Sequence, residues 1–168
     1  MSAGGINLWG ASDQFHFAWN TLKGDFIVRA RIEFVGQGVD AHRKLGWMVR
    51  STLDADSAYA DACVHGDGLT SLQFRRTKGA ATEQVLLPLK GGDVIQLERR
   101  GLTYLFSSAR YGETFVTASV ADLQLGDAVN VGLFLCSHNA AVKEEAVFKD
   151  VRIVQSPKVG YVPYRDYL

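Results

Sequence analysis

The sequence predicts an all-β sandwich of two antiparallel sheets of the jelly-roll type, and three observations lead there. Apolar and polar residues alternate with a period of two along nearly the whole chain, as in strands that bury one face. Glycine-containing turns separate these segments at short intervals, while only three of the 168 residues are proline. No stretch shows the apolar spacing of an amphipathic helix, so about ten or eleven short strands are expected.

The stretch from Leu45 to Arg76 predicts three consecutive strands together with their register. The strands are expected at residues 44–51, 58–65 and 69–76. Gly66-Asp67-Gly68 forms the second turn, because glycine and aspartate tolerate the positive φ of tight loops. With this loop His65 faces Leu69, and apolar residues share one face while polar residues share the other. A two-residue turn would mix the faces, since a one-residue slip turns every side chain over.

The remaining segments of alternating polarity complete the single domain, residues 1–155. Strands are expected at residues 14–19, 25–35, 84–87, 93–99, 102–109, 114–120, 129–136 and 146–154. Residues 156–168 lose the alternation and hold two of the three prolines, so they predict a C-terminal tail or linker. Because residues 159–168 are rich in apolar side chains, we expect them to fold back over the domain or to cross to a second copy of the chain.

Composition narrows the possible partners. Hydrophobic residues make up 47% of the chain, enough for one sizeable core. Lysine plus arginine equals aspartate plus glutamate, 18 each, so no net charge attracts nucleic acid or acidic lipid. No apolar run approaches the roughly 18 residues of a membrane span, and we expect no membrane partner. The N-terminus lacks the pattern of a signal peptide. The sequence as written indicates the cytoplasm, and a removed signal would indicate the periplasm or secretion, so localisation stays open.

Cysteine and acidic spacing predict no metal and no cofactor. Cys63 and Cys136 each fall inside an expected strand, and buried free thiols are expected rather than a disulfide. There is no CxxC and no Cys/His cluster of the zinc-binding kind. Asp54 and Asp56 resemble part of a calcium loop but lack the glycine and terminal glutamate of an EF-hand, so a polar turn is expected.

Several segments are familiar in combination: WGASDQFHFAW, LKGDFIVRARIEF, HRKLGWMVR, VHGDGLTSLQFRR, VGLFLCSHN and FKDVRI. Together they resemble a bacterial family of concanavalin A-like, lectin-like β-sandwich domains of uncharacterised function, over roughly residues 8–154. Similar domains lie ahead of Tol-type β-propellers in biopolymer transporter-like proteins. The resemblance implies the concanavalin A-like fold and, as a partner, a β-propeller or a second copy. Family members usually carry an additional first strand, so here either the start is truncated or an edge strand is expected from the tail or a neighbouring molecule.

Many concanavalin A-like sandwiches bind or cut glycans on their concave sheet. A retaining glycosidase needs two carboxyl groups about 5–5.5 Å apart, and related laminarinase-like hydrolases carry them as Glu-x-Asp-x-x-Glu. The chain has no such pattern, and its pairs Asp54/Asp56 and Glu144/Glu145 are expected in loops. Asp61 is the only carboxylate well placed on the polar face of the central strands. We therefore assign no catalytic residue.

That polar face is the candidate ligand-binding site. Its residues are Arg50, Tyr59, Asp61, His65, Gln73 and Arg75. Arginine offers bidentate hydrogen bonds to vicinal hydroxyls or a carboxylate, and Tyr59, Trp9 or Trp47 could stack on a sugar ring. Trp47 shares a face with Leu45 and Val49, which favours the core. The alternative is an ordinary solvated face with cross-strand pairs.

One loop adds two residues to the candidate site, and a second loop carries a basic cluster outside it. His138 and Asn139 follow the expected strand 129–136, where they either orient a ligand or satisfy loop backbone groups. His42, Arg43 and Lys44 form a basic cluster before a strand, expected as a solvated turn, with a phosphate or acidic partner as the alternative.

The sequence thus favours a non-catalytic module that binds carbohydrate or a related polar polymer. A structural or protein-interaction domain is the first alternative. A glycoside hydrolase-like enzyme is the second.

Overall fold

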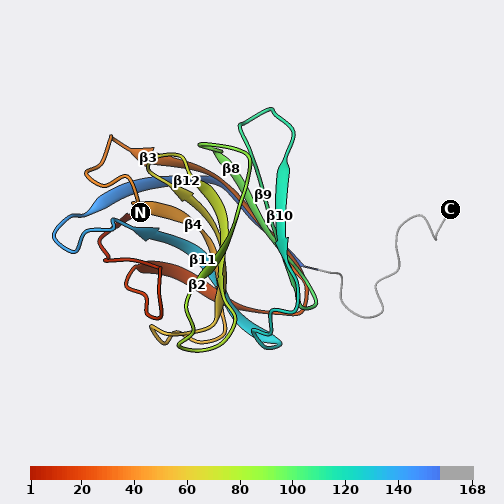
Figure 1. Cartoon of the computed structure of the whole chain (residues 1–168). Helices are drawn as coiled ribbons and strands as arrows, with labels where there is room; N and C mark the ends of the chain where they lie inside the picture. Colours follow the sequence, from red (N-terminus) through yellow and green to blue (C-terminus); the bar gives the residue numbers. More distant parts are fainter. Residues whose placement is uncertain (156–168) are drawn as a thin grey trace.

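Two six-stranded antiparallel sheets, stacked face to face, make up the computed structural model, which describes residues 1–155 (Figure 1). The back sheet has the strand order β1-β12-β3-β8-β9-β10, and the front sheet has the order β2-β11-β4-β5-β6-β7. The strands of the back sheet are β1 Ser2–Ala3, β3 Phe26–Val35, β8 Val94–Arg100, β9 Thr103–Ala109, β10 Val116–Val120 and β12 Glu144–Gln155. Those of the front sheet are β2 His16–Lys23, β4 Lys44–Arg50, β5 Tyr59–His65, β6 Thr70–Arg75, β7 Glu83–Leu86 and β11 Ala128–Cys136. The predicted all-β sandwich is confirmed.

The main core lies between the two sheets and uses the apolar side chains of every alternate position. Leu45, Trp47 and Val49 of β4 point into it, and Val28 and Phe106 meet them from the back sheet. Trp47 is therefore a core residue, as its parity predicted. Burying one such large side chain contributes about 1.5–3 kcal/mol, and the alternation that supplies them is what specifies which face turns inward.

The predicted register of the β5–β6 hairpin is confirmed. Asp61 pairs with Gln73 and Tyr59 pairs with Arg75. The His65 amide donates to the Leu69 carbonyl, which closes the three-residue loop. Gly68 adopts φ 86° there, a conformation that costs glycine little.

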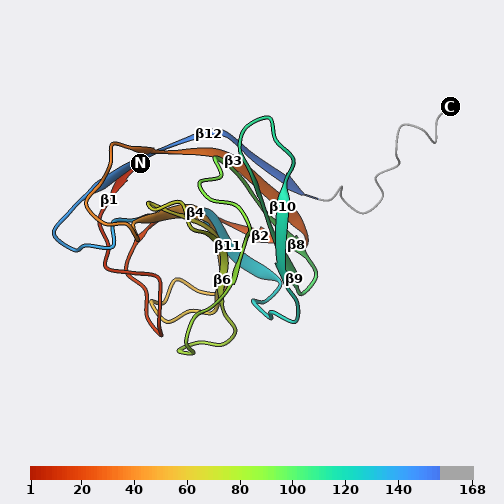
Figure 2. The same ribbon diagram turned by 45° about the horizontal axis from the view of Figure 1, so that its top comes forward.

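A second, smaller core lies on the outer face of the front sheet and was not predicted. The N-terminal segment, here residues 4–15, runs over this face on the side away from β8, β9 and β10 (Figures 1 and 2). Leu8 from this segment is fully buried, and it packs with side chains on the outer face of the front sheet, where the alternation placed Tyr59 among the polar residues. The residues that pack with Leu8 are Met48, Tyr59, Cys63, Phe134 and Cys136. Both cysteines are free and buried, as predicted.

Strand bounds differ from the prediction mainly at the sheet edges. β2 begins two residues late and continues to Lys23, since its backbone pairs with β11 as far as Ala128. Glu144 and Glu145 lie in β12 rather than in a loop, where the two-residue strand β1 pairs with them. The N-terminus itself thus supplies a short edge strand. The predicted fold-back or exchange of residues 159–168 lies outside the described residues, as does the tail boundary at residue 156.

Candidate functional site

The candidate residues nearest the β4–β5 loop hold the N-terminal segment in place. Asp13 of that segment accepts hydrogen bonds from Arg50 Nη1 at 2.7 Å and from Arg75 Nη1 and Nη2 at 2.9 and 2.7 Å. All three side chains are almost fully buried. The prediction of an open polar face is wrong here, because Asp13 covers both guanidinium groups and leaves them no free surface for a ligand.

Tyr59 lies in the same network. Its hydroxyl donates to the Leu8 carbonyl at 3.0 Å and lies 3.0 Å from Thr82 Oγ1. The Arg75 guanidinium carbon sits 5.0 Å from the centre of the tyrosine ring, within range of a cation–π contact. Burial, with the charge of Asp61 second, raises the pKa of Tyr59 well above its ordinary value. Tyr59 therefore anchors the segment and is not available to stack on a sugar.

Asp61 is fully buried beneath the N-terminal segment, and neither carboxyl oxygen has a hydrogen-bond partner among the described residues. Burial raises the pKa of Asp61 well above its ordinary range, and nearby Lys44 opposes this only in part. Since an unpaired buried carboxylate is costly, this burial favours the protonated, neutral form of Asp61.

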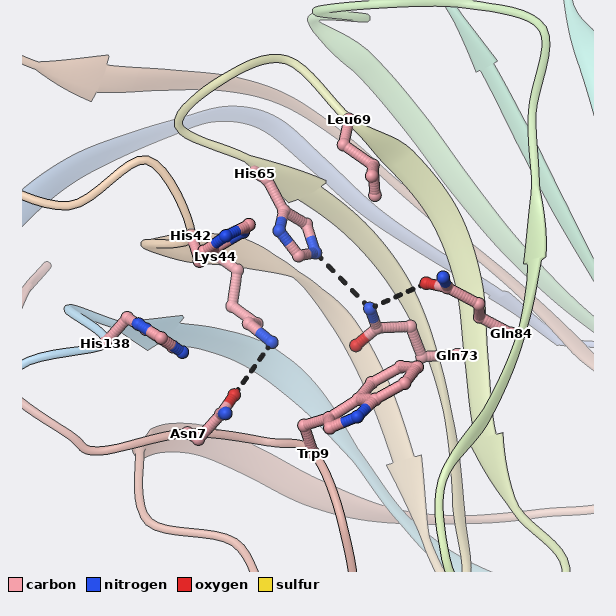
Figure 3. A pocket seen from close by; sticks show the side chains of 9 residues that line it. All are labelled: Asn7, Trp9, His42, Lys44, His65, Leu69, Gln73, Gln84 and His138. Carbon is pink, nitrogen blue, oxygen red and sulfur yellow. Dashed lines mark hydrogen bonds between the residues drawn. The ribbon is translucent and has the colours of Figure 1, made fainter.

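The other end of the face forms an open pocket of about 270 Å³, here the front pocket. Five adjacent strands or strand ends each contribute one side chain, in the spatial order of the sheet: His138 after β11, Lys44 from β4, His65 from β5, Gln73 from β6 and Gln84 from β7. Asn7, Trp9, His42 and Leu69 complete the lining. Figure 3 shows Asn7 and Trp9 of the N-terminal segment on one side of this row and Leu69 on the other. The front pocket thus extends across the strands of the front sheet, over the part of the outer face that the N-terminal segment does not cover.

Gln73 is the hydrogen-bonding centre of the front pocket. Its Nε2 lies 3.3 Å from His65 Nε2 and donates to Gln84 Oε1 at 3.4 Å (Figure 3). Both amide protons are then engaged, so His65 Nε2 accepts and the imidazole proton resides on Nδ1. Burial, helped by the charge of Lys44, lowers the pKa of His65 to about 3 and keeps the ring neutral. Gln73 Oε1 is buried with no partner among residues 1–155, so this acceptor is unsatisfied, and a rotation of the amide toward the front pocket would present it to a ligand.

Lys44 is 2% exposed, and its Nζ donates to Asn7 Oδ1 at 3.0 Å. The predicted solvated turn is wrong for Lys44 and also for Arg43, which pairs with Glu144 at 2.6 Å in a buried contact. Lys44 is the first residue of β4 and pairs with His65. Its side chain therefore lies on the outer face of the front sheet, the same face as Met48.

His138 and His42 form the wall of the front pocket beyond Lys44. His138 adopts φ 59°, uncommon for a residue with a side chain, and its Nδ1 lies 3.2 Å from Asp40 Oδ2. The His42 ring is 5.4 Å from that of His138, centre to centre. Hydrogen bonds from the His42 amide and His138 lower the pKa of Asp40. Asn139 caps the loop instead, since its Oδ1 accepts from the Ala141 amide.

Of the predicted site residues, the structure brings His65, Gln73 and His138 to the front pocket and keeps Arg50, Tyr59, Asp61 and Arg75 under the N-terminal segment. Of the other lining residues, the sequence analysis named Trp9 for stacking, and His42 and Lys44 in a basic cluster with a phosphate or acidic partner as the alternative. It did not assign Asn7, Leu69 or Gln84 to a site. Gln84 could have been predicted, because it lies directly opposite Gln73 in the β6–β7 pair. Asn7 could not, because the segment that carries it has no strand pattern.

Three other features bear on the chemistry. Within residues 1–155, no group of three or more His, Cys, Asp or Glu side chains is arranged to hold a metal ion. Asp54 and Asp56 lie in a turn, where both face Lys78. No helix in the described part of the chain could cross a membrane.

No protein-family model matches the chain, and no curated protein matches it. Solved structures do. A functionally unknown protein from Saccharomyces cerevisiae superposes with a TM-score of 0.69 at 14% identity, covering 90% of this chain and 84% of that one. A GH43 protein from Bacillus licheniformis gives 0.60 at 15% identity over 79% of this chain and 28% of its own. A family 7 alginate lyase, crystallised with its product, gives 0.52 at 14% identity over 83% of this chain and 66% of the enzyme. At such identities the likeness shows the fold, which is the concanavalin A-like jelly-roll sandwich.

Proposed function

We propose that the chain is a non-catalytic carbohydrate-binding module and that the sugar binds in the front pocket. The observation that carries this proposal is the set of unused polar groups on the buried floor of the front pocket. Gln73 Oε1 accepts no hydrogen bond, and Lys44 Nζ uses only one of its three donors among the described residues. A sugar hydroxyl both donates and accepts, so vicinal hydroxyls match these two groups.

Trp9 supplies the apolar surface that a sugar ring needs. It lines the front pocket and remains 44% exposed, so its indole face is open to a ligand although the segment that carries it is anchored by Asp13 and Leu8. Leu69 adds a second apolar surface. An aromatic wall beside a few fixed polar groups is the common composition of a small-ligand site.

The dimensions favour a single sugar unit over a long chain. The volume of about 270 Å³ falls just under the ~300–1,000 Å³ typical of drug-sized ligands. We therefore expect recognition of one residue or a chain end.

Hydrolysis has no support in this site. None of the nine residues that line the front pocket is Asp or Glu within the described chain, whereas glycosidases commonly act through a carboxylate pair. Two structural neighbours are GH43 proteins and a third is an alginate lyase. Their fold supports carbohydrate recognition by analogy alone.

A glycan array followed by calorimetric titration of the best binder tests the proposal. Wild type should bind at least one glycan class, and Trp9→Ala should weaken that binding about tenfold or more, the equivalent of about 1.4 kcal/mol. Trp19→Ala is the matched control, because Trp19 is 46% exposed on β2 and does not line the front pocket. It should bind like wild type. No binding to any glycan class, or equal losses in the two variants, would contradict the proposal.

A further inference from the structure

Lys44 differs from the buried arginines of the front sheet in having no anionic partner. Arg43 pairs with Glu144, and Arg50 and Arg75 share Asp13. Lys44 is just as buried, yet the only hydrogen bond of its Nζ within residues 1–155 goes to the neutral amide of Asn7. A buried cation without a counter-charge is costly, so an anionic ligand that pairs with Lys44 would stabilise this position.

Among the described residues, no carboxylate near Lys44 forms an ion pair with its ammonium group. The nearby acid, Asp61, forms no ion pair with it among the described residues, and its own burial favours the neutral form. Asp40 lies beyond His42 and His138 and is engaged by both. The other groups that line the front pocket are neutral amides and apolar side chains, apart from the three imidazoles. Lys44 is therefore the single lysine or arginine among the described residues that line the front pocket, and no carboxylate lines it beside the lysine.

We infer that the ligand of the front pocket is an acidic sugar whose carboxylate pairs with Lys44. The inference rests on the proposed carbohydrate function and names its substrate class. The two unused Nζ donors of Lys44 meet the carboxylate, the Gln73 amide rotates so that Oε1 accepts from a ring hydroxyl, and Trp9 packs on the ring face. These three groups line a single volume, so one ring can engage them together.

The charge balance distinguishes a carboxylate from a phosphate. A carboxylate carries one negative charge, equal to the single cation of the front pocket. A phosphate monoester carries about −1.5 to −2 at neutral pH and would leave excess negative charge beside a single lysine. A sulfate ester also carries one charge and must be separated by experiment.

Calorimetric titration with oligogalacturonate, with the neutral galactose oligomer of the same length, and with a sulfated form of that oligomer tests the inference. Wild type should bind oligogalacturonate at least tenfold more tightly than the neutral and sulfated oligomers. Lys44→Met should lose this preference, and Lys44→Arg should keep a part of it. Lys149→Met is the control, since it removes the same charge from an exposed position on β12, and it should match wild type.

Each outcome separates the inference from the proposed function. Equal binding of acidic and neutral oligomers overturns the inference and leaves the carbohydrate function standing, and preference for the sulfated oligomer overturns the choice of carboxylate. If none of the three oligomers binds although other neutral glycans do, the inference also fails. Circular dichroism checks that Lys44→Met is folded. Should it unfold, the salt dependence of wild type decides: the ratio of acidic to neutral affinity should fall severalfold from 50 to 500 mM NaCl, and a constant ratio would count against Lys44.

Discussion

Asp13 is the residue on which the covered half of the front sheet depends. One carboxylate receives three hydrogen bonds from two arginines that lie on different strands, and neither arginine has another carboxylate partner among the described residues. Charge-assisted bonds of this bidentate kind are the stronger class of hydrogen bond. The network joins a segment without strand structure to a rigid sheet.

Replacing Asp13 by asparagine should therefore destabilise the protein by about 3 kcal/mol, because it leaves two buried guanidinium groups without a counter-charge. Urea unfolding monitored by tryptophan fluorescence measures the change. Asp54→Asn is the control: Asp54 pairs with Lys78 at the surface, and its replacement should leave the midpoint unchanged. A loss of the same size in both variants would show that the buried network has no special weight.

Asp61 makes a prediction about pH. Its pKa is raised in the folded protein from an ordinary value of 3.8, so above pH 3.8 the unfolded chain releases a proton that the folded chain keeps. Its contribution to stability is thus greatest below that pH and falls as the pH rises toward the folded pKa. Asp61→Asn cannot ionise, and it should gain stability relative to wild type between pH 4 and pH 7. A difference between the two proteins that stays constant over this range would mean that Asp61 is not buried in its neutral form.

His65 should change the folding stability with pH in the opposite direction. Its pKa is lowered from 6.5 to about 3, so the unfolded chain takes up a proton below pH 6.5 that the folded chain refuses. Folding stability is then lost as the pH falls from 6.5 toward 3. His65→Gln should lose less stability than wild type between pH 7 and pH 4.5, measured by urea unfolding at both values. Equal losses would argue that the ring is solvated.

At the scale of elements, the N-terminal segment sets the boundary between the covered face and the front pocket. Gly5 allows its path: the residue has φ 143°, and a Cβ there would lie 2.4 Å from the Gln14 carbonyl oxygen. Cys136, whose Sγ lies 3.6 Å from the same oxygen, and Cys63 are both fully buried on this face. Their thiols therefore report whether the segment is in place.

Gly5→Ala should displace the segment and accelerate the reaction of both thiols with Ellman's reagent severalfold. In wild type the reaction should be slow, because burial hides the thiols and raises their pKa values. Gly112→Ala is matched in backbone strain, with φ 87°, but its Cβ would meet nothing within 4 Å, and it should leave the rate unchanged. Thiols that react in native wild type as fast as in urea would contradict the described position of the segment.

The strands and their register followed from the sequence because alternation and glycine turns are local signals. Tyr59 opposite Arg75 and the Gly66–Gly68 loop were predicted on this basis. The burial of the polar face did not follow, because it depends on Asp13 and Leu8, which are distant in the sequence from their partners. Asp13 lies 37 residues from Arg50 and 62 from Arg75, and Leu8 lies 51 from Tyr59. The same reason explains why Lys44 was expected in solvent and why Asn7 was missed. Of the residues that line the front pocket, the sequence assigned only His65, Gln73 and His138 to the candidate site. Strand alternation placed His65 and Gln73, and the loop after residues 129–136 placed His138.

At the scale of the whole molecule, the open edge of β12 is protected against pairing. After Glu145 its outer edge has no partner strand within residues 1–155, and exposed edges of this kind invite association. A bulge interrupts β12 between Lys149 and Arg152, where Asp150 adopts φ 52°. Bulges and charges are two features that blunt an edge.

We therefore expect the sandwich to remain monomeric through this edge. Replacing Lys149, Asp150 and Arg152 together by threonine should promote association, which light scattering measures as a rise in mass with concentration. Lys90→Thr is the control, because Lys90 is exposed in the loop before β8, and it should leave the mass unchanged. A stable wild-type dimer that these three substitutions dissociate would show instead that the charged bulge is an interface, and it would favour the alternative of an interaction domain.

The location of the bound sugar tests the central claim most directly. Two-dimensional ¹H–¹⁵N spectra of the full chain, recorded during titration with the best-binding glycan, report every backbone amide and the indole and side-chain amide groups. We predict that the largest shifts fall on the Trp9 indole and on the side-chain amides of Gln73 and Gln84, with none at Trp19. Shifts that centre on β2, on the back sheet or on no single region would contradict the assignment of the front pocket as the binding site.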